Sequence, residues 1–137
     1  IRHAVLTGDL PVFDDVAAHL PNADLWRARL AEAQEQAPST FTNNAWTVGA
    51  LQAAWSAIAH TPEPAENPSD HLVDTLTTAI RIGHDTDTVA AIAGALLGAR
   101  WGTAALPQRW VEMLHGWPGT DAAGVAELAR QIATTAR

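Results

Sequence analysis

The feature of this sequence that most constrains its fold is the spacing of its apolar side chains. Over residues 44–60, Val48, Leu51, Trp55 and Ile58 recur every three or four positions, which places them on one face of an α-helix. No long stretch alternates β-branched and polar residues, as a half-buried strand would. Hydrophobic residues make up 47% of the chain and charged residues 17%, which is typical of a folded protein. The pattern predicts an all-α protein.

Glycine and proline fall mostly between the helical stretches and indicate where each helix ends. We expect a helical bundle of about six helices, in a single helical domain or fragment over residues 1–137. Asn43 or Asn44 is expected to cap the helix that ends near residue 60. Residues 1–23 have the weakest pattern, with a short helix over 14–20. The main expected helices cover residues 24–36, 44–60, 70–82, 89–100, 107–114 and 121–132.

Charge and composition exclude several classes of function. Fifteen acidic residues against eight basic ones give a net charge of −7, so a surface that tracks nucleic-acid phosphates is not expected. The absence of cysteine excludes disulfides and thiolate metal sites. No apolar run approaches the roughly 20 residues of a membrane span. We therefore expect a cytoplasmic protein, and the Ala- and Arg-rich, lysine-free composition suggests a bacterial one.

The chain begins without an initiator methionine and without the apolar core of a signal peptide. We expect it to be a piece of a longer protein. Six tryptophans are many for this length. Trp26, Trp55 and Trp110 lie on apolar helix faces and are expected in the core. Trp101 and Trp117 lie near helix ends, where they could line a cleft or an interface.

An acidic turn carries the strongest chemical signal. Asp85 and Asp87 are separated by one residue, and Thr88 adds a hydroxyl group. Oxygen ligands of this kind suit Mg²⁺ or Mn²⁺. Aspartate and threonine are also common at helix starts, so the turn could be only a well-capped helix terminus. In the helix that follows, Ala90, Gly94 and Gly98 form a ridge of small residues that predicts close packing against another helix.

The run of residues 83–88 (GHDTDT), continued by residues 94–99 (GALLGA), closely resembles the C-terminal part of the ADP-ribosylglycohydrolases. ADP-ribosyl-arginine hydrolase and the dinitrogenase-reductase-activating glycohydrolase belong to that family. The resemblance covers residues 43–117. It implies an all-α fold, two Mg²⁺ or Mn²⁺ ions in the complete protein, and hydrolysis of the glycosidic bond that joins ADP-ribose to its carrier.

The resemblance also implies roles for individual residues. Asp85, Asp87 and Thr88 correspond to the family's C-terminal metal ligands. Trp46 corresponds to an aromatic residue that stacks on adenine, although it could instead be a core residue. His84 departs from the glycine that members often have at that position. Residues 1–42 lack the family's N-terminal metal-binding motif, and the acidic pair at residues 14–15 is interpreted as an ordinary helix start.

These observations predict the C-terminal part of a divalent-metal-dependent hydrolase that acts on ADP-ribosylated proteins or ADP-ribose derivatives. The catalytic acid/base residue is unknown and expected in a missing N-terminal half or a companion chain. Alone, the chain should bind metal weakly, turn over no substrate and self-associate. The alternative is a non-catalytic helical binding or interaction module derived from the same fold.

Overall fold

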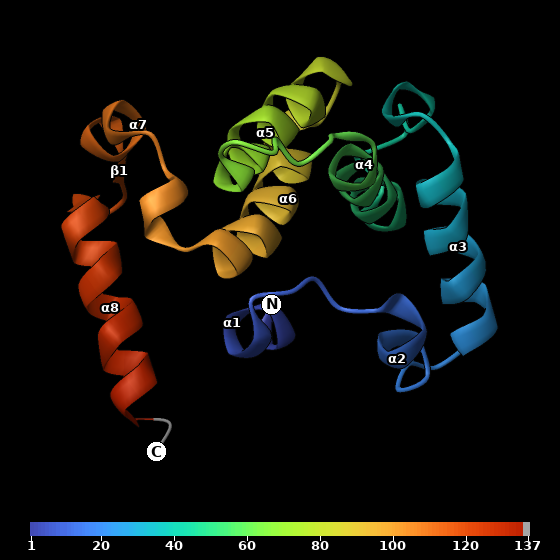
Figure 1. Cartoon of the computed structure of the whole chain (residues 1–137), viewed down its shortest axis with the longest axis horizontal. Coiled ribbons are helices and arrows are strands. Elements are labelled where there is room, and N and C mark those ends of the chain that lie inside the picture. Colours follow the sequence, from blue (N-terminus) through green and yellow to red (C-terminus); the bar gives the residue numbers. More distant parts are fainter. Residues whose placement is uncertain (136–137) are drawn as a thin grey trace. The chain divides into compact units, whose positions relative to one another are not determined.

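The computed structural model describes residues 1–135, and nearly all of its regular structure is helical (Figure 1). The chain forms two compact units, Ile1–Ala105 and Leu106–Arg137. The all-α expectation is confirmed. Eight α-helices occur in the described residues, more than the six or so expected. The two additional helices are short, and both lie within residues 1–23, where the apolar pattern is weakest.

The first unit contains six α-helices joined by turns and short 3₁₀ helices. The extra helix at its start was not predicted, because only Ala4 of its residues is buried and no apolar stripe marks it. The helix bounds are α1 Arg2–Thr7, α2 Phe13–Ala17, α3 Ala23–Glu35, α4 Thr47–His60, α5 His71–Arg81 and α6 Thr86–Trp101, with 3₁₀ helices at Pro38–Thr40, Pro68–Asp70 and Thr103–Ala105.

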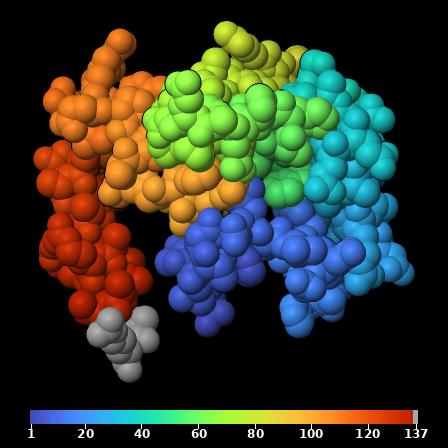
Figure 2. Space-filling model, in the orientation of Figure 1, coloured from blue at the N-terminus to red at the C-terminus, as the bar shows by residue number. Residues whose placement is uncertain are grey.

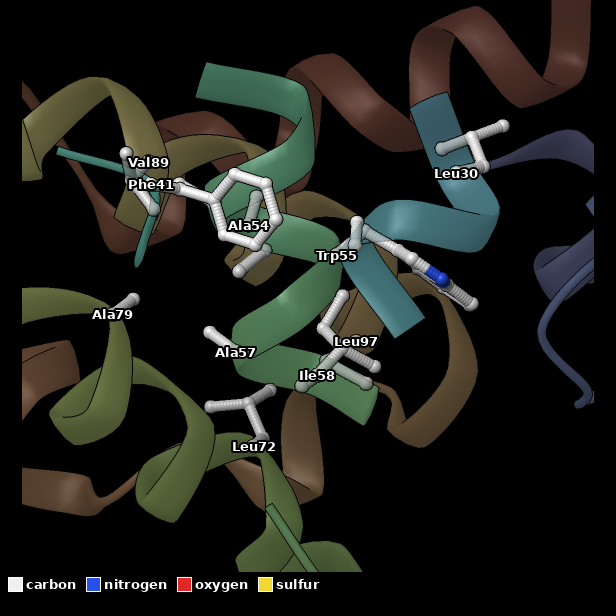
Figure 3. Packing of buried hydrophobic residues seen from close by; sticks show 13 residues of the cluster. Leu30, Phe41, Ala54, Trp55, Ala57, Ile58, Leu72, Ala79, Val89 and Leu97 are labelled. Atoms are coloured by element: carbon white, nitrogen blue, oxygen red, sulfur yellow. The ribbon is translucent and has the colours of Figure 1, made fainter. Parts of the chain in front are cut away.

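Helix α4 is the centre of this unit. It packs against α3, α5 and α6, and nine of its residues are buried. Ala53, Ala54 and Ala57 are fully buried, and their small side chains let the neighbouring helices approach closely. Trp55 and Ile58 fill the larger spaces between those helices (Figure 3). In the space-filling view only a small part of α4 shows between its neighbours (Figure 2).

The α6 helix faces this core with Val89, Ala93 and Leu97, all fully buried at four-residue spacing. The expected close approach along its small-residue ridge is wrong within the described residues. A Cβ atom built on Gly94 would lie 3.5 Å from the Leu76 Cδ2 atom, an ordinary contact, and one built on Gly98 would have no neighbour within 4 Å. The larger side chains, not the ridge, determine which face of α6 packs.

The second unit consists of α7 (Gln108–Met113), a two-stranded antiparallel hairpin and α8 (Ala122–Thr135). The hairpin pairs β1 (His115–Gly116) with β2 (Thr120–Asp121). The expected cap of the last helix is confirmed, because the Asp121 Oδ1 atom accepts a 2.9 Å hydrogen bond from the Gly124 N–H. None of residues 106–135 is buried.

The burial of the tryptophan side chains corrects one prediction, that Trp110 lies in the core, and confirms another, that Trp55 does. Trp110 is 39% exposed and does not belong to a core. Trp55, at 6% exposed, does, while Trp117 is 94% exposed. Along α8 the apolar side chains of Val125, Leu128 and Ile132 are exposed as well. Across residues 1–135, no helix has the length and apolar character needed to cross a bilayer.

Candidate functional site

The acidic turn connects α5 to α6 through two consecutive residues with left-handed backbone. Gly83 has φ 85° and His84 has φ 64°. Glycine adopts this conformation freely, whereas a residue with a side chain does so at a cost. The reversal puts Asp85 at the N-cap position of α6 and leaves Asp87 and Thr88 in its exposed first turn. The three predicted ligands therefore lie at one helix start.

The Asp85 side chain does not cap the helix. Asp85 occupies the N-cap position, but its side chain makes no capping hydrogen bond to the free N–H groups of α6. A capping aspartate would accept such a bond with its carboxylate. The interpretation of the turn as a capped helix terminus is therefore wrong for Asp85. Its carboxylate remains available to another partner.

The surroundings of Asp87 favour its charged form. The pKa of Asp87 lies below the ordinary aspartate value, first because of a hydrogen bond with the Asp85 side chain. The N–H groups of Asp87 and Thr88 lower it further. Asp87 is thus ionised at neutral pH, two positions along the chain from a second carboxyl group. Such a pair is a suitable environment for a cation.

A buried asparagine on another segment holds this turn. Asn44 is 0% exposed, and its side chain makes two hydrogen bonds to the turn. The Asn44 Nδ2 group donates to the Gly83 carbonyl oxygen at 3.0 Å, and the Asp85 N–H donates to the Asn44 Oδ1 atom at 3.0 Å. The prediction that Asn43 or Asn44 caps α4 is wrong, because the helix starts at Thr47 with Trp46 at its N-cap.

Gly49 allows Asn44 to occupy this position. A Cβ atom built on Gly49 would lie 2.1 Å from the Asn43 carbonyl oxygen, far inside any real contact. The backbone of residues 43–44 therefore passes directly against the first turn of α4. The sequence contains one sign of this approach, a glycine in the first turn of a helix, where it lowers helix propensity.

Trp46 lies two residues after Asn44 and is not a core residue. Its side chain is 48% exposed, so the alternative that placed it in the core is wrong. It lines a pocket of about 140 Å³, and the Arg29 guanidinium lies 5.9 Å from the centre of its ring. Trp46 follows Asn44 by two residues, which keeps the two Cα atoms within about 7 Å. The pocket is lined by Leu25, Trp26, Arg29, Trp46 and Val48.

The acidic pair at residues 14–15 belongs to a different place. Both residues lie in the first turn of α2, as expected of a helix start. The Asp14 Oδ1 atom lies 3.3 Å from the Arg27 Nε atom, in an ion pair with α3. A cavity of about 470 Å³ adjoins this pair and is lined partly by Phe13 and Trp55. Asp14 therefore has a structural partner.

The donors of the acidic turn fit a hard divalent cation in type. Asp85, Asp87 and Thr88 offer two carboxylates and a hydroxyl, which are the oxygen ligands that Mg²⁺ and Mn²⁺ prefer. Over residues 1–135, no group of three or more His, Asp or Glu side chains is arranged to hold a metal ion. The turn itself offers three oxygen donors, fewer than the six of an octahedral shell.

Comparison with known proteins identifies the chain's relatives. The family model of the ADP-ribosylglycohydrolases matches residues 1–137. ADP-ribosylhydrolase ARH3 of Bos taurus and that of Homo sapiens are each 42% identical to it over 62 residues. Those residues are 44% of this chain and only 17% of each relative. No solved structure matches significantly. The chain belongs to the ADP-ribosylglycohydrolase family.

Proposed function

We propose that this chain carries the acidic, metal-binding turn of a divalent-metal-dependent hydrolase that cleaves the glycosidic bond of ADP-ribosylated substrates. The observation that carries the proposal is the pair of carboxyl groups at the start of α6. Asp85 stands at the N-cap of α6 and Asp87 in its exposed first turn, and the Asp85 side chain is not used to cap the helix. Membership of the ADP-ribosylglycohydrolase family supports the choice of substrate.

In this proposal Asp85, Asp87 and Thr88 hold Mg²⁺ or Mn²⁺ as part of a binuclear centre. When bound there, such ions would supply Lewis-acid chemistry and make water at the site easier to deprotonate. Trp46 binds the adenine ring by stacking, since half of its side chain is exposed beside a small apolar pocket. Arg29, close to the same ring, places a positive charge where a nucleotide would lie.

The remaining parts of the centre come from elsewhere. Three protein donors leave about three positions of an octahedral shell for water, substrate or a companion polypeptide. We assign the catalytic acid/base to a missing N-terminal half or partner chain, so this chain alone binds metal weakly and does not turn over substrate. A cytoplasmic, bacterial setting is part of the same proposal.

Titration of Mn²⁺, followed by the loss of the free-ion EPR signal, tests the proposal. The titration is run with and without ADP-ribose on wild-type protein and on the Asp85→Ala/Asp87→Ala double variant. Asp74→Ala is the matched control, because Asp74 is an exposed aspartate in the first turn of the neighbouring α5 helix. We expect weak binding that ADP-ribose strengthens, that the double variant loses and that the control retains.

The second candidate function is a non-catalytic interaction module. The exposure of Trp117 and of the apolar face of α8 favours it, because such surfaces often contact other proteins. Equal Mn²⁺ titrations for wild type and the double variant would favour this module over the hydrolase. A second copy of the chain is the partner expected from the sequence.

A further inference from the structure

Asn44 is a buried polar side chain whose hydrogen bonds go entirely to the acidic turn. It comes from the segment before α4, 39 and 41 positions away from the two residues that it contacts. A carboxamide that is 0% exposed must satisfy its donor and acceptor within the protein. Here both partners are backbone groups of one short segment, the C=O of Gly83 and the N–H of Asp85.

These two hydrogen bonds hold the backbone on both sides of His84, the strained residue of the turn. They flank His84, which is in the left-handed conformation that disfavours residues with side chains. Because this conformation is unfavourable for a residue with a side chain, hydrogen bonds from outside the turn help to hold it. Holding Gly83 and Asp85 on either side of His84 sets the direction in which the chain enters α6. It thereby sets where the carboxyl groups of Asp85 and Asp87 point.

We propose that Asn44 is a positioning residue that holds the acidic turn in the geometry that binds the divalent cation. The inference rests on the proposed function and adds a residue that does not touch the metal. Groups that orient metal ligands from behind typically change metal affinity about 10- to 100-fold when removed. We expect a loss of that size for Asn44→Ala.

Gly49 provides an independent route to the same effect. A methyl group at Gly49 would meet the Asn43 carbonyl oxygen at 2.1 Å, so the 43–44 backbone would have to move. Gly49→Ala keeps the Asn44 carboxamide but displaces it from its two partners. We expect this variant to lose Mn²⁺ affinity as well, by less than Asn44→Ala.

The matched control is Gln52→Ala. Gln52 is also a buried carboxamide with two hydrogen bonds, at 2.9 Å to the Arg29 carbonyl oxygen and at 2.8 Å to Glu32 Oε2. Both of its partners lie on α3, away from the acidic turn. Its loss should lower stability in the way that the loss of Asn44 does. It should leave Mn²⁺ affinity unchanged.

The experiment uses ¹⁵N-labelled protein and two measurements. Paramagnetic broadening of the amide signals of residues 84–88 during Mn²⁺ titration gives the affinity, even when binding is weak. Hydrogen exchange of the Asp85 amide reports its bond to Asn44 without metal. We expect Asn44→Ala to lose the Asp85 protection and to weaken Mn²⁺ binding about 10- to 100-fold, while Gln52→Ala changes neither.

The outcomes separate the two proposals. If wild-type protein shows no localised broadening, the proposed metal site fails, and the positioning role fails with it. If wild type binds Mn²⁺ at the turn and Asn44→Ala binds it equally well, only the positioning role is overturned. If Gln52→Ala weakens binding as much as Asn44→Ala, the effect is a general loss of stability, and the positioning role is again overturned.

Discussion

Replacing helical glycines by alanine should give effects of opposite sign at Gly49 and Gly98. At Gly98 a Cβ atom has no neighbour within 4 Å in the described structure, so alanine adds helix propensity without a clash. We expect Gly98→Ala to raise the free energy of unfolding by about 0.5–1 kcal/mol. At Gly49 the same methyl group lies 2.1 Å from a backbone oxygen that no rotamer change can move.

The size of the Gly49→Ala effect follows from that distance. The Asn43 carbonyl must retreat by more than 1 Å to reach an ordinary contact of about 3.5 Å. Overpacking of this kind costs about 1–3 kcal/mol, and the gain in helix propensity offsets about 0.5–1 kcal/mol of it. An overlap at 2.1 Å belongs in the upper part of that overpacking range, so we expect a net loss of about 1–2.5 kcal/mol, or roughly 3–11 °C in melting temperature.

Urea denaturation followed by far-UV circular dichroism measures both variants against wild type. Gly94→Ala serves as a third member of the series, since its added methyl group would be in ordinary contact with Leu76 and should be neutral to stabilising. A Gly49→Ala protein that is as stable as Gly98→Ala would show that residues 43–44 do not pass against α4 as described. The account of how Asn44 reaches the turn would then be wrong.

Three further predictions concern the site and the surface. Trp46→Ala should weaken ADP-ribose binding by about 1–3 kcal/mol, or roughly 5- to 150-fold, in calorimetric titration, whereas Trp46→Phe should retain most of it; equal affinities would exclude stacking. His84→Gly should raise stability by up to about 1 kcal/mol in urea denaturation, because glycine removes the left-handed strain but adds entropy to the unfolded chain; a loss would mean that the imidazole makes a stabilising contact. Leu128→Glu should reduce self-association in light scattering, because Leu128 is 54% exposed on the apolar face of α8; a wild-type protein that stays monomeric at high concentration would contradict this expectation.

The main helices were predictable because their apolar residues recur at helical spacing. The stripe from Val48 to Ile58 correctly located α4, and Gly83 and Gly102 correctly marked the ends of α5 and α6. The short α1 helix was not predictable, since it buries only Ala4. Trp110 was misplaced because a tryptophan on an apolar helix face has the same pattern whether or not another element covers it.

The candidate metal ligands could be identified from their residue types, but Asn44, the residue that holds their turn, could not. Two aspartates and a threonine at one helix start are visible in the sequence as oxygen donors. Asn44 has no such signal, because asparagine before a helix is so often a cap. Its actual partners are about 40 positions away, and only the folded chain brings them together. The capping prediction failed because tertiary contacts outweighed the local preference.

The long sequence separation between Asn44 and its partners also orders the events of folding. A hydrogen bond across 39 or 41 positions cannot form until the intervening chain has closed into a loop. Closing that loop lowers the conformational entropy of the chain before the bond can form. The acidic turn should therefore reach its final geometry only after α4, α5 and α6 have docked. A cation bound there would slow the unfolding of this unit more than it would speed its folding, because the site is absent from the early, loosely packed chain.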